Sequence, residues 1–230
     1  MTENIIYKKS YADLPEIRDR EIWRYAGYKG IPGEDERKLL DTLEQVKEEL
    51  KGRFTYRVCY RRLPLLWLEG EPQLPFESHS RALAECLKNS NEIVFFAASI
   101  GPMCDRMIAR YEKQSPIKAL LLQAYGAERI ETLCDHFSGE VREEAAFFCQ
   151  EISPRFSPGY GDFPLEHQRD FFRLLDCSRQ IGVSLGESLL MSPSKSVTAV
   201  FGIRPASGLK SGHKCGDCGK SDCEYRQEYM

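Results

Sequence analysis

The feature that most constrains the fold is a long stretch of helical periodicity that begins at Ser115 and runs to about Gln150. Serine followed by proline is a typical helix start, because serine caps free backbone amides and proline fits the first turn. Glycines at positions 126 and 139 either bend this helix or divide it. Apolar side chains recur along it at intervals of three and four residues, as on a buried helix face: Leu122, Tyr125, Ile130, Leu133, Phe137, Val141, Ala145 and Phe148.

Shorter helices and strands are predicted on both sides of this stretch. Apolar stripes, several of them with serine or glycine boundaries, predict helices at 21–28, 34–51, 78–89, 103–114 and 165–175. Strands are predicted at 54–60, 93–98, 181–185 and 196–201, of which the second is apolar throughout and is expected to be buried on both faces. The last two bracket residues 191–194 and are expected to pair like a hairpin. Residues 1–203 are therefore predicted to form one α+β domain with a mixed or antiparallel sheet.

Composition and charge exclude several classes of function. The 230 residues carry a net charge of −3 with both signs interspersed, which argues against nucleic acid or an anionic membrane surface as a partner. No apolar run approaches the length of a membrane span, and the polar N-terminus lacks the apolar core of a signal peptide. Six of the nine cysteines lie among apolar neighbours, as reduced core thiols of a cytoplasmic protein do: Cys59, Cys86, Cys104, Cys134, Cys149 and Cys177.

A loop rich in proline and glycine follows the long helical stretch, from Ser153 to Pro164. Its three prolines exclude both a helix and a central strand, and its glycines permit positive φ and a close approach of the backbone. Between Gly159 and Gly161 the loop presents the ring of Tyr160, and Arg155 adds a cation. These groups suit a small zwitterionic ligand with a flat base, although an ordinary surface turn has the same composition.

The resemblance to a known family rests on two motifs. Arg-Phe-Ser-Pro-Gly-Tyr at 155–160 resembles the Arg-Pro-x-Pro-Gly-Tyr loop in the activation (reactivation) domain of cobalamin-dependent methionine synthase. Gly-Glu-Ser-x-x-Met-x-Pro-x-x-Ser-Val at 186–197 resembles that domain's Thr-Glu-Ser-x-x-Met-x-Pro-x-x-Ser-Val, in the same order and at comparable spacing. A weaker match in the long helical stretch extends the resemblance to about half of the chain, and the chain's size suggests a stand-alone form of the domain.

This resemblance implies a function in rescuing methionine synthase whose cobalamin has been oxidised to cob(II)alamin. The family combines one electron from a flavodoxin- or ferredoxin-type donor with a methyl group from S-adenosylmethionine to regenerate methylcobalamin. The partner would then be a cobalamin-binding methionine synthase or a related corrinoid protein, which carries the cobalamin. The chain itself would hold the methyl donor and dock the partner, as an accessory component of a methyltransferase system.

The resemblance also implies ligand contacts for S-adenosylmethionine. Arg155 would bind its carboxylate, Glu131 would balance its ammonium, and Tyr160 on Gly159 would face its sulfonium. Glu131 is equally well explained as a solvated helix residue. Three further positions fall within the matched segments: Glu187, for which a buried carboxylate capping a turn is an equal explanation, and Phe201 and Gly202, expected as backbone contacts.

The sequence departs from the family pattern at three points. Gly-Asp-Phe-Pro at 161–164 replaces the family's Pro-Ala-Cys-Pro, and Gly186 replaces its threonine. No residue in the N-terminal part matches the family's acidic ligand contact there. These departures leave open a non-catalytic interaction module, such as a chaperone for a corrinoid protein. A reactivator of another corrinoid methyltransferase is a further alternative.

The last residues, 204–230, are predicted to be a tail that begins with a linker at 204–208. Three cysteines, Cys215, Cys218 and Cys223, lie within nine residues among glycine, lysine and aspartate, with little around them to pack against. Cys-x2-Cys is a common metal-binding spacing, and a fourth ligand would come from His213 or elsewhere. An iron–sulfur cluster, a zinc ion and a metal-free tail are all compatible with this pattern.

Overall fold

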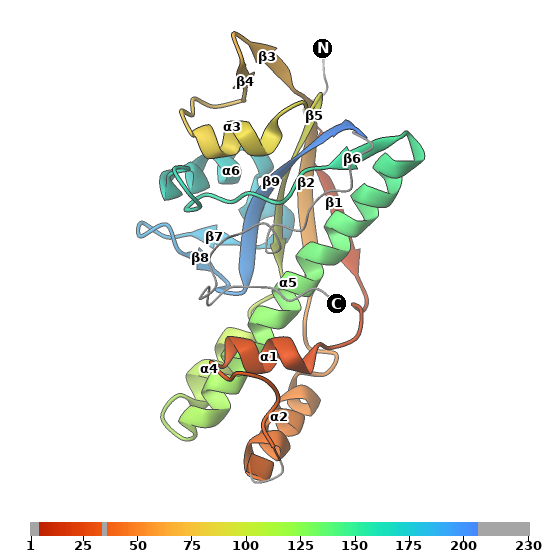
Figure 1. Cartoon of the computed structure of the whole chain (residues 1–230). Coiled ribbons are helices and arrows are strands. Elements are labelled where there is room, and N and C mark those ends of the chain that lie inside the picture. The colour runs from red at the N-terminus through yellow and green to blue at the C-terminus, as the bar shows by residue number, and fades with distance from the viewer. Residues whose placement is uncertain (1–4, 34–35, 207–230) are drawn as a thin grey trace.

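The computed structural model describes residues 5–33 and 36–206 of the chain (Figure 1). Its helices are α1 (Asp19–Tyr25), α2 (Arg37–Leu50), α3 (Arg81–Leu87), α4 (Met103–Tyr111), α5 (Pro116–Phe147), α6 (Gln168–Leu175) and α7 (Cys177–Ile181), with a 3-10 turn at Leu165–His167. Its strands are β1 (Tyr7–Tyr11), β2 (Tyr56–Pro64), β3 (Leu66–Leu68), β4 (Glu71–Gln73), β5 (Glu92–Ser99), β6 (Gln150–Ile152), β7 (Ser184–Leu185), β8 (Met191–Ser192) and β9 (Ser196–Pro205). The predicted α+β class is confirmed.

The main sheet has the strand order β1-β2-β5-β9-β6, and every neighbouring pair in it is antiparallel. Two short hairpins, β3–β4 and β7–β8, lie outside it. β5 occupies the centre and pairs along its whole length with β2 on one side and β9 on the other. All but its first residue are buried, because helices cover both faces of the sheet, as its continuous apolar sequence predicted.

Helix α5 crosses one face of the sheet (Figure 1). Its 32 residues make it about 48 Å long at the usual rise per residue. The ring of Phe137 lies at the centre of this contact, 5.1 Å from both Tyr60 and Phe96 and 6.4 Å from Phe201, measured between ring centroids. Alternate residues of β5 and β9 therefore meet the C-terminal part of α5 in one hydrophobic core.

The opposite face of the sheet is covered by α3, α6 and α7. The intervening residues of β5, among them Phe95, point to this face and contact Leu87, Phe171 and Ile181 in a second core. The edge-on contact between Phe95 and Phe171, at 5.3 Å between centroids, fixes α6 against the centre of the sheet. The sheet is thus the middle layer of three, and its two faces are filled from different parts of the chain.

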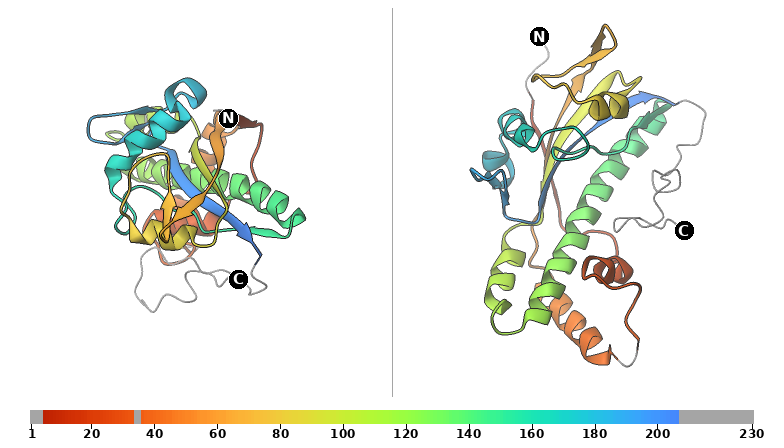
Figure 2. Two further views of the ribbon diagram at one scale, coloured as in Figure 1. Left: turned by 90° about the horizontal axis from the view of Figure 1, so that it is seen from above. Right: turned by 60° about the vertical axis from the view of Figure 1, so that its left-hand side comes forward.

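The N-terminal part of α5 extends beyond the sheet and is surrounded by α1, α2 and α4 (Figure 2). A third core lies there, built on Trp23, Leu43, Leu50 and Leu122. Neither Gly126 nor Gly139 divides α5, which runs from Pro116 to Phe147. A Cβ on Gly126 would lie 2.5 Å from the Cys104 sulfur and 3.0 Å from Lys195, so glycine allows α4 and the start of β9 to approach the helix closely. One continuous helix therefore belongs to two cores.

Several sequence-based expectations need correction. Residues 181–185 and 196–201 do not pair with each other: β7 pairs with β8, whereas β9 pairs with β5 and β6. Arg204 and Pro205, expected in a linker, are the last residues of β9 because they pair with Glu151 and Gln150. Cys149 is exposed and is not a core thiol. Short strands β1, β3, β4 and β6 were not predicted, and no described helix combines the length and apolar character needed to cross a membrane.

Deleting residues 209–230 is expected to leave a cooperatively folding domain, because the residues of all three cores lie before Arg204. The midpoint of thermal unfolding, followed by circular dichroism, should change by less than about 4 °C, the shift that 1 kcal/mol produces in a domain of this size. A chain that ends at Ser194 is the control, since it lacks β9 and should not fold. Loss of the cooperative transition in the longer truncation would show that the tail belongs to the core.

Candidate functional site

Arg155 lies where the proline- and glycine-rich loop passes over α5. Its Nη2 donates hydrogen bonds to Glu131 Oε2 at 3.0 Å and to Asp135 Oδ1 at 2.8 Å. The two carboxylates are one helical turn apart on the same face of α5, so a single guanidinium can reach both. The Arg155 side chain is 23% exposed and Asp135 is 50% exposed, which leaves this cluster open to solvent on one side.

The environment of Arg155 keeps it charged. Burial alone would lower the pKa of its guanidinium, but the negative charges of Glu131 and Asp135, together with the hydrogen bond to Glu131, raise that pKa above its ordinary value. The thiol of Cys134 is fully buried, and this burial raises its pKa, so it stays neutral. The site therefore presents one permanent cation beside two carboxylates.

The loop that carries Arg155 runs alongside β9. Ser153 N donates to Gly202 O at 2.8 Å, and Gly202 N donates to Ser153 Oγ at 2.9 Å. Further along, Phe156 and Val200 exchange two backbone hydrogen bonds of 2.8 Å. These contacts place the predicted loop and the predicted strand side by side, as a shared groove requires.

Two residues of β9 that were expected to contact a ligand have structural roles. The amide and carbonyl of Gly202 are both bonded to Ser153, and a Cβ on Gly202 would lie 2.1 Å from Ser90 Oγ. Glycine is therefore needed at this position for the close packing of Ser90. The ring of Phe201 is buried in the core under α5.

Tyr160 projects from a tight turn at the tip of the loop. Gly159 N donates to Phe163 O at 2.8 Å, and Phe163 N returns a bond to Tyr160 O at 2.9 Å. Gly159 has a φ of +94°, a conformation that favours glycine. The Tyr160 ring is 58% exposed and meets Phe156 edge-on, and desolvation of its hydroxyl beside Glu131 raises its pKa, so the phenol stays neutral. A rigid turn thus holds an accessible aromatic ring on the loop of Arg155.

The departure from the family pattern at 161–164 has a structural explanation. Asp162 accepts hydrogen bonds from Ser80 Oγ at 2.5 Å and from the amides of Arg81 and Ala82 at 2.9 and 3.2 Å. These amides belong to the first turn of α3, so the carboxylate caps that helix, and the bond from Ser80 lowers the pKa of Asp162. Phe163 is buried next to it. Asp162 fixes α3 to the loop, and the Phe163 ring packs against Phe156 and His167, without replacing Arg155 or Tyr160.

The second motif, 186–197, joins β9 to three other elements. Ser194 N donates to Asp105 Oδ2 of α4 at 2.7 Å, and Lys195 Nζ donates to Gln123 Oε1 of α5 at 2.6 Å. Ser196 Oγ donates to Ser99 Oγ at the end of β5 at 3.0 Å. Glu187 lies in the turn between β7 and β8 and is exposed, so a buried capping carboxylate was the wrong explanation for it. Glu187 is not among the described residues that hydrogen-bond Arg155.

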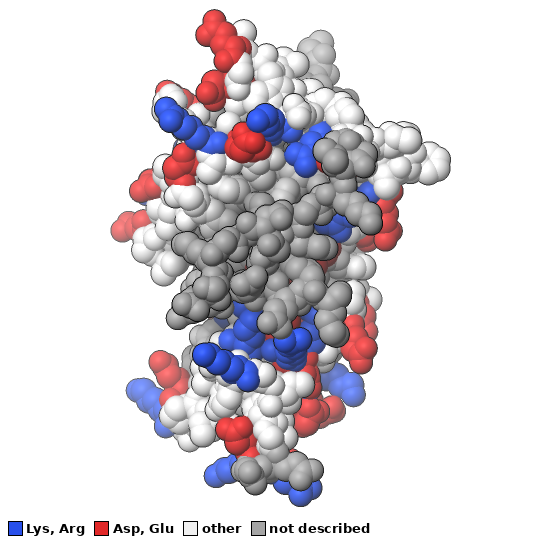
Figure 3. Space-filling model, in the orientation of Figure 1, with Lys and Arg blue, Asp and Glu red and all other residues white. Residues whose placement is uncertain are grey.

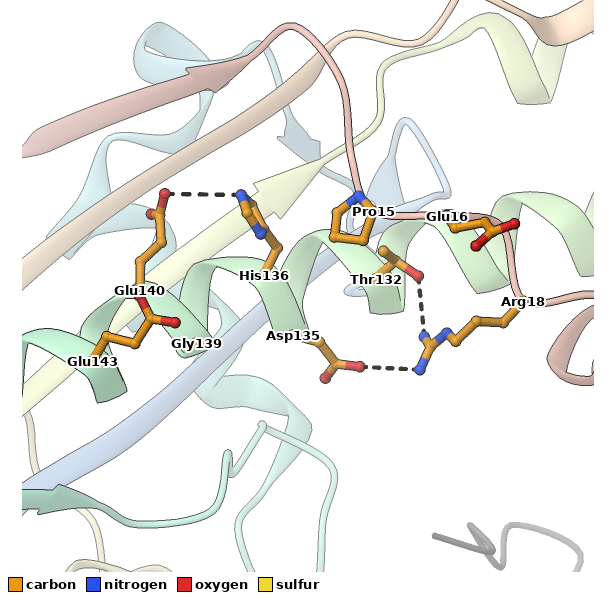
Figure 4. A pocket seen from close by; sticks show the side chains of 9 residues that line it. All are labelled: Pro15, Glu16, Arg18, Thr132, Asp135, His136, Gly139, Glu140 and Glu143. Carbon is orange, nitrogen blue, oxygen red and sulfur yellow. Dashed lines mark hydrogen bonds and ion pairs between the residues drawn. The ribbon is translucent and has the colours of Figure 1, made fainter. Parts of the chain in front are cut away.

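A pocket of about 370 Å³ adjoins this cluster, between α5 and the N-terminal segment (Figure 4). Arg18 reaches across it, with Nη1 3.5 Å from Asp135 Oδ2 and Nη2 bonded to Thr132 Oγ1 at 3.0 Å. Asp135 is therefore shared by Arg18 and Arg155. The remaining lining is largely acidic and comes from Glu16, Glu140 and Glu143, together with Pro15, His136 and Gly139.

The sequence did not indicate Arg18 or Asp135. The four-residue spacing between Glu131 and Asp135 was the available signal for the second carboxylate, because it places both on one helix face. Arg18 had no such signal, since its partners lie more than a hundred residues away. The structure also brings the N-terminal segment, in which no acidic contact had been identified, to this face with Glu16 lining the pocket. Basic side chains gather over α1 on the molecular surface (Figure 3).

A buried ion pair anchors this segment to α5. Glu128 and Arg129 are 0% and 3% exposed, and two hydrogen bonds of 2.5 and 2.8 Å join their side chains. Arg129 Nη1 also donates to Pro15 O at 3.0 Å, and Glu128 Oε1 accepts from Arg18 N at 3.2 Å. Burial raises the pKa of Glu128, but the bonds and charge of Arg129 and the hydroxyl of Thr132 outweigh it, so the pKa lies below its ordinary value.

The predicted metal ligands Cys215, Cys218 and Cys223 lie outside the described residues. Within residues 5–33 and 36–206, no group of three or more histidine, cysteine, aspartate or glutamate side chains is arranged to hold a metal ion.

Comparison with known proteins identifies a family by sequence and a similar fold by structure. A family model described as "Vitamin B12 dependent methionine synthase, activation domain" matches residues 73–228, more than half of the chain. The crystal structure of the MetH reactivation domain bound to AdoHcy superimposes with a TM-score of 0.65 at 15% sequence identity, over 89% of this chain and 80% of that one. At this identity the superposition shows the fold alone. No curated protein matches the sequence significantly.

Replacing Glu128 by glutamine is expected to reduce the free energy of unfolding at pH 7 by about 3–5 kcal/mol, because Arg129 is left buried without its charged partner. Because the pKa of Glu128 is lowered by folding, its contribution is complete above the ordinary glutamate pKa of about 4.3 and is lost as the pH falls through the lower, folded-state value. Urea unfolding at pH 7 and at lower pH should therefore show the gap between wild type and variant narrowing in acid.

Glu48→Gln is the matched control, because Glu48 forms an exposed ion pair with Lys51. This substitution should change the free energy of unfolding by less than about 1 kcal/mol. Equal effects of the two substitutions would contradict an anchoring role for Glu128.

Proposed function

The chain belongs to the activation-domain family of vitamin B12-dependent methionine synthase, and from this membership we propose that it binds S-adenosylmethionine to remethylate cobalamin carried by a partner protein. The observation that carries the proposal is the position of Arg155, held between Glu131 and Asp135 on the loop that also presents Tyr160. The related reactivation domain binds AdoHcy, the demethylated form of the same molecule, which supports this ligand class.

Arg155 is suited to bind the carboxylate of the ligand. A guanidinium has five N–H donors, and the bonds to Glu131 and Asp135 both use Nη2, so donors remain for a second acceptor. The two carboxylates fix the orientation of the guanidinium before the ligand arrives, which reduces the entropy lost on binding. Because most of the side chain is shielded from water, a charge-assisted bond formed there is stronger than one at an open surface.

The ammonium and sulfonium groups of the ligand require negative charge and an aromatic face. Glu131 and Asp135 carry two negative charges and Arg155 one positive charge, so these three residues have one negative charge in excess. Arg18, which also pairs with Asp135, offsets part of that excess. The exposed ring of Tyr160 can face a sulfonium, a cation–π contact of about 0.5–2 kcal/mol. We propose that Glu131, Arg155, Gly159 and Tyr160 form the ligand site, with Asp135 as an added member, and that Glu187, Phe201 and Gly202 act through the surrounding structure.

S-adenosylmethionine supplies the methyl group: once cob(II)alamin has gained one electron, the methyl carbon passes from sulfur to cobalt and AdoHcy leaves. The residues of this chain would bind the methyl donor, orient its sulfonium and exclude competing geometries. The partner is proposed to be a cobalamin-binding methionine synthase or related corrinoid protein. The electron would come from a flavodoxin- or ferredoxin-type donor docked on the same complex.

The alternative of a non-catalytic corrinoid-protein module rested on the changed residues after Tyr160. In the structure Asp162 attaches α3 to the loop and Phe163 is buried in the core, which gives these changes a structural reason that is independent of ligand binding. A reactivator of a different corrinoid methyltransferase uses the same site, and only the partner separates it from the first proposal.

Arg155→Ala is expected to weaken S-adenosylmethionine binding by about 1.5–3 kcal/mol, the usual loss for a hydrogen bond to a charged group. Isothermal titration calorimetry of wild type and variant measures this as a roughly ten- to hundredfold rise in Kd. Arg173→Ala is the matched control, because Arg173 is 77% exposed on α6 and should leave the Kd unchanged. Unchanged affinity in a folded Arg155→Ala protein would remove Arg155 from the site.

The remethylation step can be tested with a methionine synthase that lacks its own activation domain and holds cob(II)alamin. Adding this chain, S-adenosylmethionine and a one-electron reductant should produce the absorption spectrum of methylcobalamin, whereas the Arg155→Ala chain should produce it at least tenfold more slowly. A chain that binds S-adenosylmethionine but gives no methylcobalamin with this partner would contradict the proposed partner, and the same assay with another corrinoid protein would then follow.

A further inference from the structure

Arg18 is held in a fixed position on the N-terminal segment by two buried residues of α5. Its backbone amide donates to Glu128 Oε1 at 3.2 Å, and its Nε donates to the same oxygen at 3.3 Å. Its Nη2 donates to Thr132 Oγ1 at 3.0 Å. Glu128 and Thr132 are 0% and 5% exposed, so packing fixes both acceptors. The guanidinium of Arg18 is therefore oriented before any ligand arrives.

These two partners do not neutralise the charge of Arg18. Thr132 is uncharged, and the carboxylate of Glu128 already receives two hydrogen bonds, of 2.5 and 2.8 Å, from Arg129. A further acidic partner is Asp135, whose Oδ2 lies 3.5 Å from Nη1 of Arg18. This separation is longer than a normal hydrogen bond, and the Arg18 side chain is 46% exposed. The Nη1 group therefore keeps donors for another acceptor.

Asp135 lies between two guanidiniums that come from distant parts of the chain. Its Oδ1 accepts a hydrogen bond from Arg155 Nη2 at 2.8 Å, whereas its Oδ2 faces Arg18. Because one carboxyl group contacts both arginines, the two cations meet at the same place on α5. Asp135 is half-exposed, so this place is open to solvent. Two cations beside one exposed carboxylate form a place where a second carboxylate can bind.

The charges at this place balance before a ligand is bound. Arg18 and Arg155 carry two positive charges, and the carboxylates paired with them, Glu131 and Asp135, carry two negative charges. In the function proposed above, Glu131 becomes the partner of the ligand's ammonium. Both guanidiniums are then left with the single charge of Asp135. A carboxylate on the same ligand restores the balance when it binds beside them.

The pocket next to this place has one position that suits a carboxylate. Arg18 is the one lysine or arginine among the described residues that line the pocket, and its side chain crosses it (Figure 4). Three glutamates, Glu16, Glu140 and Glu143, make much of the remaining lining acidic. An anionic group is therefore repelled by most of the lining and attracted only near Arg18.

We propose that Arg18 is a second carboxylate-binding residue of the ligand site and makes the site selective for ligands that carry an amino-acid carboxylate. This inference rests on the proposed function, because it assigns Arg18 a role toward the same S-adenosylmethionine. Arg155 binds the carboxylate from the loop, and Arg18 binds it from the N-terminal segment. A methyl donor that lacks the carboxylate loses both charge-assisted contacts.

The test compares S-adenosylmethionine with decarboxylated S-adenosylmethionine, which keeps the sulfonium and the amine. Calorimetry at about 0.15 M salt, where charges more than about 8 Å apart are largely screened, gives the Kd of each ligand. Wild type should bind S-adenosylmethionine at least tenfold more tightly than the decarboxylated form. In Arg18→Gln this preference should fall at least threefold, because the Kd of S-adenosylmethionine rises while that of the decarboxylated form stays within twofold.

Two further variants separate carboxylate binding from other effects. Arg18→Lys should recover part of the preference, because lysine keeps the charge but not the planar fork. Arg24→Gln is the matched control: it removes the same charge from α1, where Arg24 is bonded to Glu21 at 3.0 and 2.7 Å, and should leave the preference unchanged. The bond from the Arg18 amide to Glu128 is formed by the main chain, so it persists in both Arg18 variants.

The possible results distinguish this inference from the proposed function. An equal loss of affinity for both ligands in Arg18→Gln would give Arg18 a purely structural role and overturn the inference, as would unchanged affinity for both. Wild type that binds the two ligands equally would also overturn it, while S-adenosylmethionine binding would stand. Wild type that binds neither ligand would overturn the proposed function, and the role of Arg18 together with it.

Discussion

The structure depends on one helix that serves two hydrophobic cores. The C-terminal part of α5 packs on the sheet through Phe137, and its N-terminal part is enclosed by α1, α2 and α4. Between the two, α5 carries a row of polar side chains, Glu128, Glu131, Thr132 and Asp135, beside the core residues Ile130, Leu133 and Cys134. The loop of Arg155 and the N-terminal segment both meet α5 there, one through Glu131 and Asp135 and the other through Glu128. The candidate site therefore exists because the helix is not interrupted between its cores.

Local sequence signals were sufficient for most of the fold and failed where pairing is long-range. The Ser115–Pro116 start, the apolar stripe as far as Ala145 and the buried strand β5 each depend on neighbours in the sequence, and each is confirmed. Phe148, the last residue of the predicted stripe, is exposed instead. The sequence around Gly126 suggested a break in the helix. The actual reason for glycine there is the close approach of the Cys104 sulfur, which lies on another helix. The pairing of β9 with β5 could not be predicted from local sequence either, because any of several β-prone segments could satisfy its hydrogen bonds, and the two strands are brought together by packing in the cores on both faces of the sheet.

Part of the candidate site was also predictable from local sequence, and the rest depends on contacts between distant segments. Arg155 and Tyr160 were identifiable because prolines and glycines define a rigid loop around them. Asp135 and Arg18 were missed because the sequence does not distinguish a charged residue that is solvated from one that forms an ion pair with a distant residue. Asp162 is instructive in another way: a change in the family pattern that suggested lost function proves to be a helix cap for α3. A departure from a motif can thus reflect different packing contacts around a loop and need not mean that the chemistry of the site has changed.

The place of β9 in the sheet has a consequence for how the domain is made. β9 lies between β5 and β6, yet its residues 196–205 come near the end of the described chain, about a hundred positions after their partners in β5. During synthesis β5 therefore has one open edge while about a hundred further residues are made, and open edges invite pairing with other chains. Contacts of such long separation also slow folding. We expect the nascent chain to depend on its covering helices, and on chaperones, until Pro205 has emerged and the sheet can close.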